Sequence, residues 1–397
     1  MNRMRDAAPW LEEQGGRDRE RKAIERVLAF RLTAAAAAYR VPIDVEDVEQ
    51  LFSLASASGR EQIAEDMALA IAATLDYAQN VASATPVEQR PQIGVLNQIG
   101  WKKPADWDAP LPYVAEQAKT GQRKGEWYCC PPYHFYLGVM AGYFNKGGSD
   151  RSDTIISFNY DTTVEDALRS LGVRFSYGFS GKTVNFGPDS GGFVSEEDAS
   201  RRTLRLLKIH GSVNWAIPGK VGQKLTLYGG YEQVRTQNLS PFLVPPTWRK
   251  VFTGQLADIW DSAVDALRTA TRIIVLGYSI PVTDQHFKYL LGAGLQDNIT
   301  LRKVFFVNPA LSEENERRKL EGRLFDSPGL FRRDHVEQGV IELIPTDTKE
   351  FLTGPHDIHA REPYRERMGR SMNPKSYTGD DAPFRFSDRP QSLGAWR

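Results

Sequence analysis

The segment that decides the fold is TIISFNYD at residues 154–161, a short apolar run that ends in polar residues. Apolar runs of similar length recur downstream, and helix-length segments separate the later ones. This alternation is typical of a parallel sheet whose strands are covered on both faces. The sequence therefore predicts an α/β, Rossmann-like fold with helices on both faces of the sheet. The expected strands are Thr154–Phe158, Leu204–Ile209, Phe242–Val244, Ile273–Leu276 and Val304–Val307, and the expected helices cover about 255–271 and 283–291.

Polar or small residues follow four of these strands directly. Ligands of open α/β sheets bind beyond the carboxyl ends of the strands, so these residues rank first as candidates for a site. They are Asn159 and Asp161 after the first strand, His210 and Ser212 after the second, Gly277 and Ser279 after the fourth, and Asn308 after the fifth.

Each of these residues also has an ordinary structural explanation. Asn159 or Asp161 could cap the helix that follows. His210 beside a glycine could be a hydrogen-bonded structural histidine. Glycine, serine and Asn-Pro pairs also shape turns and open loops. The joint occurrence at four strand ends is what favours a functional site.

The chain upstream of the sheet is predicted to be helical over residues 18–84. Ile24, Val27 and Leu28 recur at helical spacing, Asp44 could cap a second helix, and a third covers about 60–81. Five prolines interrupt residues 85–127 and predict a loop-rich connector. The expected domains are a helical segment with this connector at 1–150, a core at 151–360 and a basic tail at 361–397.

Composition excludes several classes of protein. Lys+Arg and Asp+Glu both number 50 in the 397 residues, so the bulk charge favours neither nucleic acid nor an anionic membrane as a partner. The only two cysteines are adjacent, Cys129 and Cys130, which excludes a disulfide framework and paired zinc knuckles. No secretory signal or membrane span is apparent. We therefore expect a cytoplasmic protein.

The strand-end motifs together resemble the sirtuin-like superfamily, in particular its bacterial branch of antiviral NAD-degrading effectors. The motifs are SFNYD at 157–161, KIHGS at 208–212, GYS at 277–279 and VN at 307–308. The helical segment 43–52 and the segment 281–291, which contains Asp284, are also similar to that branch.

The resemblance implies a role for each candidate residue. Asn159 and His210 would be catalytic, with His210 as the base. The NAD+ site would be completed by Asp161 near the nicotinamide and its ribose, by Gly277 and Ser279 near the phosphate or ribose, by Asn308 at the adenosine ribose, and by Ser212 and Asp284. NAD+ would be the substrate, and no metal is expected.

The chemistry of Asn159 and His210 agrees with these roles. Cleavage of the nicotinamide–ribose bond passes through an oxocarbenium-like sugar and needs groups that hold the ribose and activate the nucleophile. The amide of Asn159 can hold a ribose hydroxyl or a water. An imidazole such as that of His210 can accept a proton near neutral pH.

Two departures from the superfamily affect this interpretation. Residues 211–272 contain no cysteine, whereas sirtuin deacylases carry a zinc module with two cysteine pairs there, so a peptide deacylase is disfavoured. No strand followed by a glycine-rich, pyrophosphate-binding turn precedes Asp153. Either the chain begins downstream of that element, or this member binds NAD+ without it.

The leading hypothesis is an NAD+ glycohydrolase of an anti-phage, abortive-infection defence system. The resemblance further implies a homo-oligomer, with a HerA-type ATPase or an Argonaute-like protein as a candidate partner, and no membrane. The first alternative is a non-catalytic nucleotide-binding or scaffold subunit, which would not need both Asn159 and His210. A protein deacylase or ADP-ribosyltransferase is the other alternative.

Overall fold

The structure is a computed structural model, and it describes two long parts of the chain. The first is residues 1–83 except 39 and 42, and the second lies between 153 and 351. The gaps in the second part are 171–172, 188–191, 200–202, 220–222, 246–253, 255, 279, 281–284, 327–330, 347 and 349–350. Ser279, Asp284, the connector at 85–127 and the tail at 361–397 therefore lie outside the described residues.

The N-terminal part is helical, as predicted. Its helices are α1 (Asn2–Gln14), α2 (Asp18–Ala38), α3 (Val48–Ala57) and α4 (Glu61–Ser83). Helix α1 was not predicted, because charged residues and Pro9 obscure its short apolar face of Met4, Ala7 and Leu11, which is buried.

The N-terminal cap of α3 differs from the expectation. Asp47, and not Asp44, caps this helix, because its carboxylate accepts hydrogen bonds from the backbone N–H groups of Glu49 and Gln50. Asp44 instead accepts a bond of 2.9 Å from the backbone N–H of Glu46 in the preceding turn. The two aspartates are three residues apart, and sequence alone does not distinguish a cap from a turn that precedes it.

Two parallel sheets confirm the predicted α/β class. The first has the strand order β1-β5-β2-β4, and the second has the order β11-β10-β9. The first contains β1 (Thr154–Ser157), β5 (Leu204–Lys208), β2 (Phe175–Ser176) and β4 (Phe193–Val194), and the second contains β9 (Arg272–Leu276), β10 (Lys303–Val307) and β11 (Ile341–Ile344).

A third, mixed sheet was not predicted. Its order is β3-β7-β6-β8, and β8 pairs antiparallel with β6. The run at 242–244, expected in the parallel sheet, therefore lies in a different sheet, since a short strand beside prolines carries no signal of its partner. The strands are β3 (Val184–Phe186), β6 (Gly211–Ala216), β7 (Leu225–Leu227) and β8 (Pro241–Leu243).

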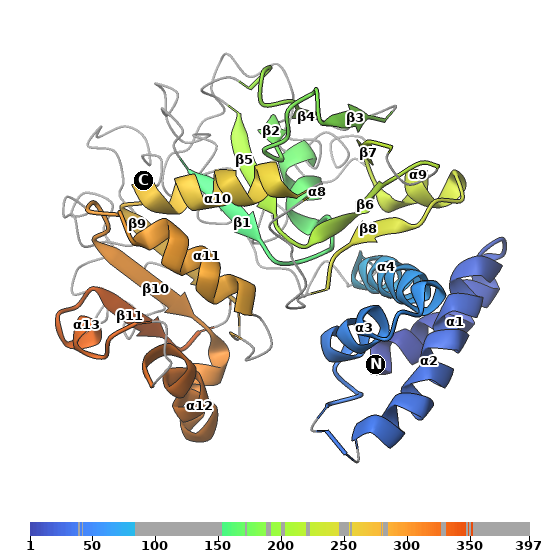
Figure 1. The fold of residues 1–397 in the computed structure, drawn as a ribbon, viewed down its shortest axis with the longest axis horizontal. Helices are drawn as coiled ribbons and strands as arrows, with labels where there is room; N and C mark the ends of the chain where they lie inside the picture. The colour runs from blue at the N-terminus through green and yellow to red at the C-terminus, as the bar shows by residue number, and fades with distance from the viewer. Residues whose placement is uncertain are drawn as a thin grey trace, which may run out of the picture.

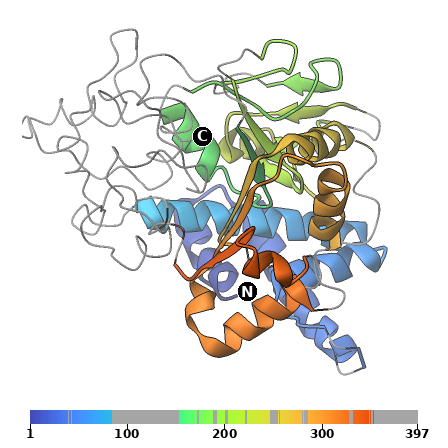
Figure 2. The same cartoon turned by 90° about the vertical axis from the view of Figure 1, so that its left-hand side faces the viewer.

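Helices cover both faces of the first sheet. Figures 1 and 2 show α10 and α11 on one side of β1 and β5, with α8 on the other. These helices span Thr163–Ser170 (α8), Ala257–Thr269 (α10) and Gln285–Leu295 (α11). The remaining helices are α9 (Tyr231–Thr236), η2 (Pro309–Ser312), α12 (Glu314–Phe325) and α13 (Asp334–Glu337).

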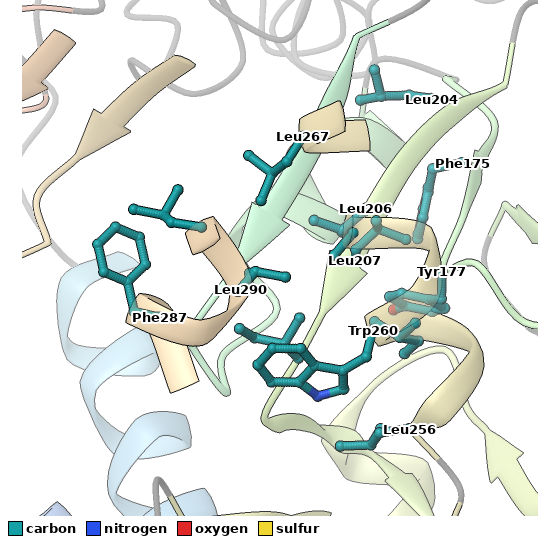
Figure 3. Packing of buried hydrophobic residues seen from close by; sticks show 14 of the residues in the cluster. Phe175, Tyr177, Leu204, Leu206, Leu207, Leu256, Trp260, Leu267, Phe287 and Leu290 are labelled. Carbon is teal, nitrogen blue, oxygen red and sulfur yellow. The ribbon is translucent and has the colours of Figure 1, made fainter. Parts of the chain in front are cut away.

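The main hydrophobic core lies between these helices and the parallel strands. Figure 3 shows Trp260 of α10 beside Leu206 and Leu207 of β5, with Phe287 and Leu290 of α11 nearby. All five side chains are buried. Burial of such side chains stabilises the fold by roughly 1.5–3 kcal/mol each, so this core holds the strand ends in place.

A second core joins the helical part to the mixed sheet. Buried residues of α1 to α4 share one cluster with Val213 of β6, Val234 of α9 and Leu243 of β8. The guanidinium of Arg19 in α2 donates to the carbonyl oxygen of Leu239 at 3.0 Å and to Ser240 at 2.8 Å. The helical part therefore packs beside β6 and β8 (Figure 1).

Among the described strands, β1 and β9 each pair on one side only. Each lies at the end of its parallel sheet. Their residues are mostly apolar, yet all are only partly buried. Within the part of the chain that the structure describes, both are therefore edge strands.

Candidate functional site

The carboxyl ends of β1 and β5 lie side by side. The register of these parallel strands pairs Ser157 with Lys208, so the residues that follow leave the sheet together. The ring of Phe158 lies 5.6 Å from the ring of His210, centroid to centroid. The first two predicted strand-end motifs thus meet at one edge of the sheet.

The ends of β9 and β10 meet in the same way in the second parallel sheet. Leu276 pairs with Val307, and the backbone N–H of Gly277 donates to the carbonyl oxygen of Val307 at 3.0 Å. The side-chain amide of Asn308 donates to the carbonyl oxygen of Tyr278 at 3.3 Å. The third and fourth motifs are therefore also adjacent.

Aromatic contacts join the two pairs of strand ends. Phe158, after β1, stacks on Tyr278, after β9, with ring centroids 4.8 Å apart. Phe287 of α11 packs edge-on against both rings, at 5.5 Å and 4.8 Å. Phe158, a residue to which the sequence interpretation gave no role of its own, thus contacts the second and third motifs directly, and the fourth motif adjoins the third through the bond between Asn308 and Tyr278.

Asn159 and Asp161 lie in the loop between β1 and α8. Asn159 is exposed, and its backbone N–H donates to the hydroxyl of Ser157 at 3.2 Å. One carboxylate oxygen of Asp161 accepts from the backbone N–H of Thr163, the first residue of α8, at 2.9 Å, which is the contact of an Asx turn just before the helix. Asp161 therefore bonds the backbone where α8 begins, but it is not the residue directly before the helix, and its other oxygen is not involved in that bond.

His210 lies in the tight turn from β5 to β6 and is 3% exposed. The backbone at the next residue, Gly211, has a φ of +84°. A side chain at Gly211 would place its Cβ 2.2 Å from the carbonyl oxygen of Phe242 in β8. The close approach of β8 to this turn therefore requires glycine, and it fixes the backbone that carries the imidazole.

The other described candidates make contacts within the protein. Ser212 in β6 is fully buried, and its hydroxyl donates to the Oδ1 atom of Asn214 at 2.6 Å. Asn308 caps η2, since its Oδ1 atom accepts from the backbone N–H of Ala310 at 2.9 Å. Gly277 is exposed, with a φ of +63°. A direct role of these three residues in binding NAD+ stays a prediction.

The sequence interpretation assigned no role to Lys208 and Glu165, which form a buried ion pair beneath this loop. The ammonium of Lys208 lies 2.8 Å from the carboxylate of Glu165, and each side chain is 1% exposed. The available signal was a lysine at the end of the mostly apolar strand LRLLK at 204–208, whose other charged residue, Arg205, is exposed. Long charged side chains are rarely buried without a specific partner.

The described residues contain neither a cluster of metal ligands nor a membrane-spanning helix. Within the described ranges, no three His, Cys, Asp or Glu side chains are grouped closely enough to hold a metal ion. Among the helices that the structure describes, none is both long enough and apolar enough to cross a membrane.

Comparison with known proteins places this site within a recognised domain. Residues 153–326 match the family model of the SIR2-like domain, which covers all four strand-end motifs. None of the curated proteins matches the chain. The match associates this part of the chain with a family of NAD-dependent enzymes, and it agrees with the resemblance to the sirtuin-like superfamily.

Proposed function

We propose that the chain is an NAD+ glycohydrolase that cleaves NAD+ to nicotinamide and ADP-ribose. The observation that carries the proposal is that His210 and the loop bearing Asn159 lie at adjacent strand ends inside the SIR2-like match. Open α/β sheets bind their ligands at this position.

The reaction consumes one water and releases one proton. The bond between the nicotinamide nitrogen and the ribose C1′ breaks, its electron pair leaves with nicotinamide, and the water oxygen bonds to C1′. In the proposal, Asn159 holds the ribose hydroxyl or the water, and His210 accepts the proton. The low exposure of His210, beside the ring of Phe158, supports a reaction shielded from bulk water.

A role in anti-phage defence belongs to the same proposal and rests on the resemblance described above. An enzyme that drains NAD+ has to be silent until it is triggered. Control by assembly into a homo-oligomer, or by a HerA-type ATPase or an Argonaute-like protein, would meet that need. These partners stay predictions.

Release of nicotinamide from NAD+ by the purified chain tests the proposal, both alone and with the candidate partners. We expect His210→Ala to lower kcat by about 10²–10⁴-fold, the usual contribution of a positioned acid–base group. We expect Asn159→Ala to lower it by about 10²–10³-fold, the usual cost of removing one hydrogen-bonding group from the transition state. His335→Ala, in α13, is the matched control and should cleave like the wild type.

The outcome also separates the alternatives. Binding of NAD+ without cleavage under every assembly condition would favour the non-catalytic scaffold. Transfer of ADP-ribose to an added protein in place of water would favour a transferase. Cleavage that survives both alanine substitutions would place the chemistry elsewhere in the chain.

A further inference from the structure

The ammonium of Lys208 is surrounded by acceptors at the end of β5. Its side chain is buried, and it donates to Glu165 at 2.8 Å, to the carbonyl oxygen of Tyr160 at 3.4 Å and to the carbonyl oxygen of Asp161. An ammonium has three N–H groups, so these three contacts use all of them. Two of the three acceptors belong to the backbone directly after Asn159.

A buried network holds the partner of Lys208 in place. Glu165 stands in the first turn of α8, and its carboxylate accepts from the hydroxyl of Tyr177 at 3.2 Å. Burial, together with the nearby carboxylate of Glu165, raises the pKa of Tyr177 well above its ordinary value, so the hydroxyl keeps its proton. The side-chain amide of Asn214 in turn donates to Tyr177 at 3.2 Å.

The same network reaches the loop a second time. The hydroxyl of Ser212, which donates its one proton to Asn214 at 2.6 Å, lies 3.3 Å from the carbonyl oxygen of Tyr160. The backbone N–H of Val213 donates to that carbonyl at 3.0 Å. The carbonyl of Tyr160 is therefore held from β5 and from β6.

Stability alone does not explain a charged pair at this position. Removing two charges from water is costly, and well-packed apolar residues of similar volume often replace a buried ion pair without loss. Apolar residues, however, cannot donate to the carbonyls of Tyr160 and Asp161. What the lysine adds is the orientation of this backbone.

We propose that Lys208 and Glu165 are positioning residues that fix the loop 158–162 and thereby aim Asn159 at the ligand. The effect on catalysis rests on the proposed function, whereas the effect on the loop does not. Displacement of a reacting group by about 1 Å can cost on the order of 100-fold in rate.

The test replaces the pair by apolar side chains in the double variant Lys208→Met/Glu165→Met, which leaves no unpaired buried charge. The matched control is Arg26→Met/Asp66→Met in the helical part. There, Arg26 bonds the fully buried Asp66 through two contacts of 2.6 and 2.5 Å, away from the strand ends. Both variants remove one ion pair with a buried carboxylate, but only the first touches the loop.

Two readouts are needed. We expect amide hydrogen exchange at residues 159–161 to accelerate at least tenfold in the Lys208 variant and not in the control. We also expect kcat for nicotinamide release to fall about 100-fold with KM changed less than about threefold, because positioning acts on the reacting geometry. A merely structural pair would give the Lys208 variant the same kcat and exchange as the control.

The outcomes separate this inference from the proposed function. If the wild type cleaves no NAD+, the exchange measurement alone decides, and unchanged exchange at 159–161 would overturn the inference. If the double variant does not fold, Glu165→Gln replaces it, because it keeps the shape and an acceptor but removes the charge. We then expect about tenfold lower kcat and faster exchange, and wild-type values of both would overturn the inference.

Discussion

At the scale of the residue, Gly211 shows how a single hydrogen atom in place of a side chain shapes the site. We expect Gly211→Ala to lower the free energy of unfolding by more than the roughly 1–3 kcal/mol of backbone strain at positive φ, because its Cβ would also meet the carbonyl oxygen of Phe242 at 2.2 Å. Urea unfolding measures the difference. Gly254→Ala is the control, since it has a φ of +91° with nothing within 4 Å of the added Cβ. Equal losses in the two variants would mean that the backbone contact at Gly211 has no energetic effect.

The residues of the candidate site could be predicted from the sequence better than their contacts. Asn159 and His210 were found because polar residues directly after apolar strands are visible as a pattern. Lys208 was visible too, but its partner Glu165 stands 43 residues away along the chain. The ion pair between them could therefore not be predicted from the sequence alone. The bonds of Asp161 and Asn308 to the following backbone likewise depend on local geometry that the pattern leaves open.

At the scale of the element, the cap of α3 provides a test between two aspartates. We expect Asp47→Ala to lower the free energy of unfolding by about 1 kcal/mol, because two N–H groups at the helix start lose their acceptor. Asp44→Ala should cost less, since its carboxylate bonds one N–H in the turn before the helix. Thermal or urea unfolding of both variants measures this. A larger loss for Asp44→Ala would contradict the assignment of the cap.

Helices with a regular spacing of apolar residues and strands with a continuous apolar run could be predicted. Elements that are very short or partly polar could not. The runs that became β1, β5, β9 and β10 were visible as short, mostly apolar runs, which are typical of parallel strands. The three-residue strand β8 has no such signature, and its antiparallel pairing with β6 depends on the turn at Gly211. Helix α1 was not predicted because its buried face consists of only three apolar residues, which stand among charged residues in the sequence.

At the scale of the whole molecule, the packing of the helical part on the mixed sheet could not be predicted from the sequence. The contacts between Arg19 and residues 238–240 join positions about 220 residues apart. No period or motif in either segment specifies the other, so only the folded chain reveals the shared core. That core includes helix residues such as Leu51 together with Val213 of β6, the strand that directly follows His210.

The shared core predicts that the helical part and the α/β part unfold together. Leu51→Ala in α3 removes a fully buried side chain and should lower the free energy of unfolding by about 2–5 kcal/mol. Because Leu51 belongs to a cluster that continues into β6 and β8, calorimetry should show one transition at a lower temperature, with equal calorimetric and van't Hoff enthalpies. Leu32→Ala in α2, where the side chain is 68% exposed, should change stability by less than about 0.5 kcal/mol. Two separate transitions, with only the first shifted by Leu51→Ala, would instead mean that the helices are an independent unit and that the contacts of Arg19 do not couple them to the strands carrying the site.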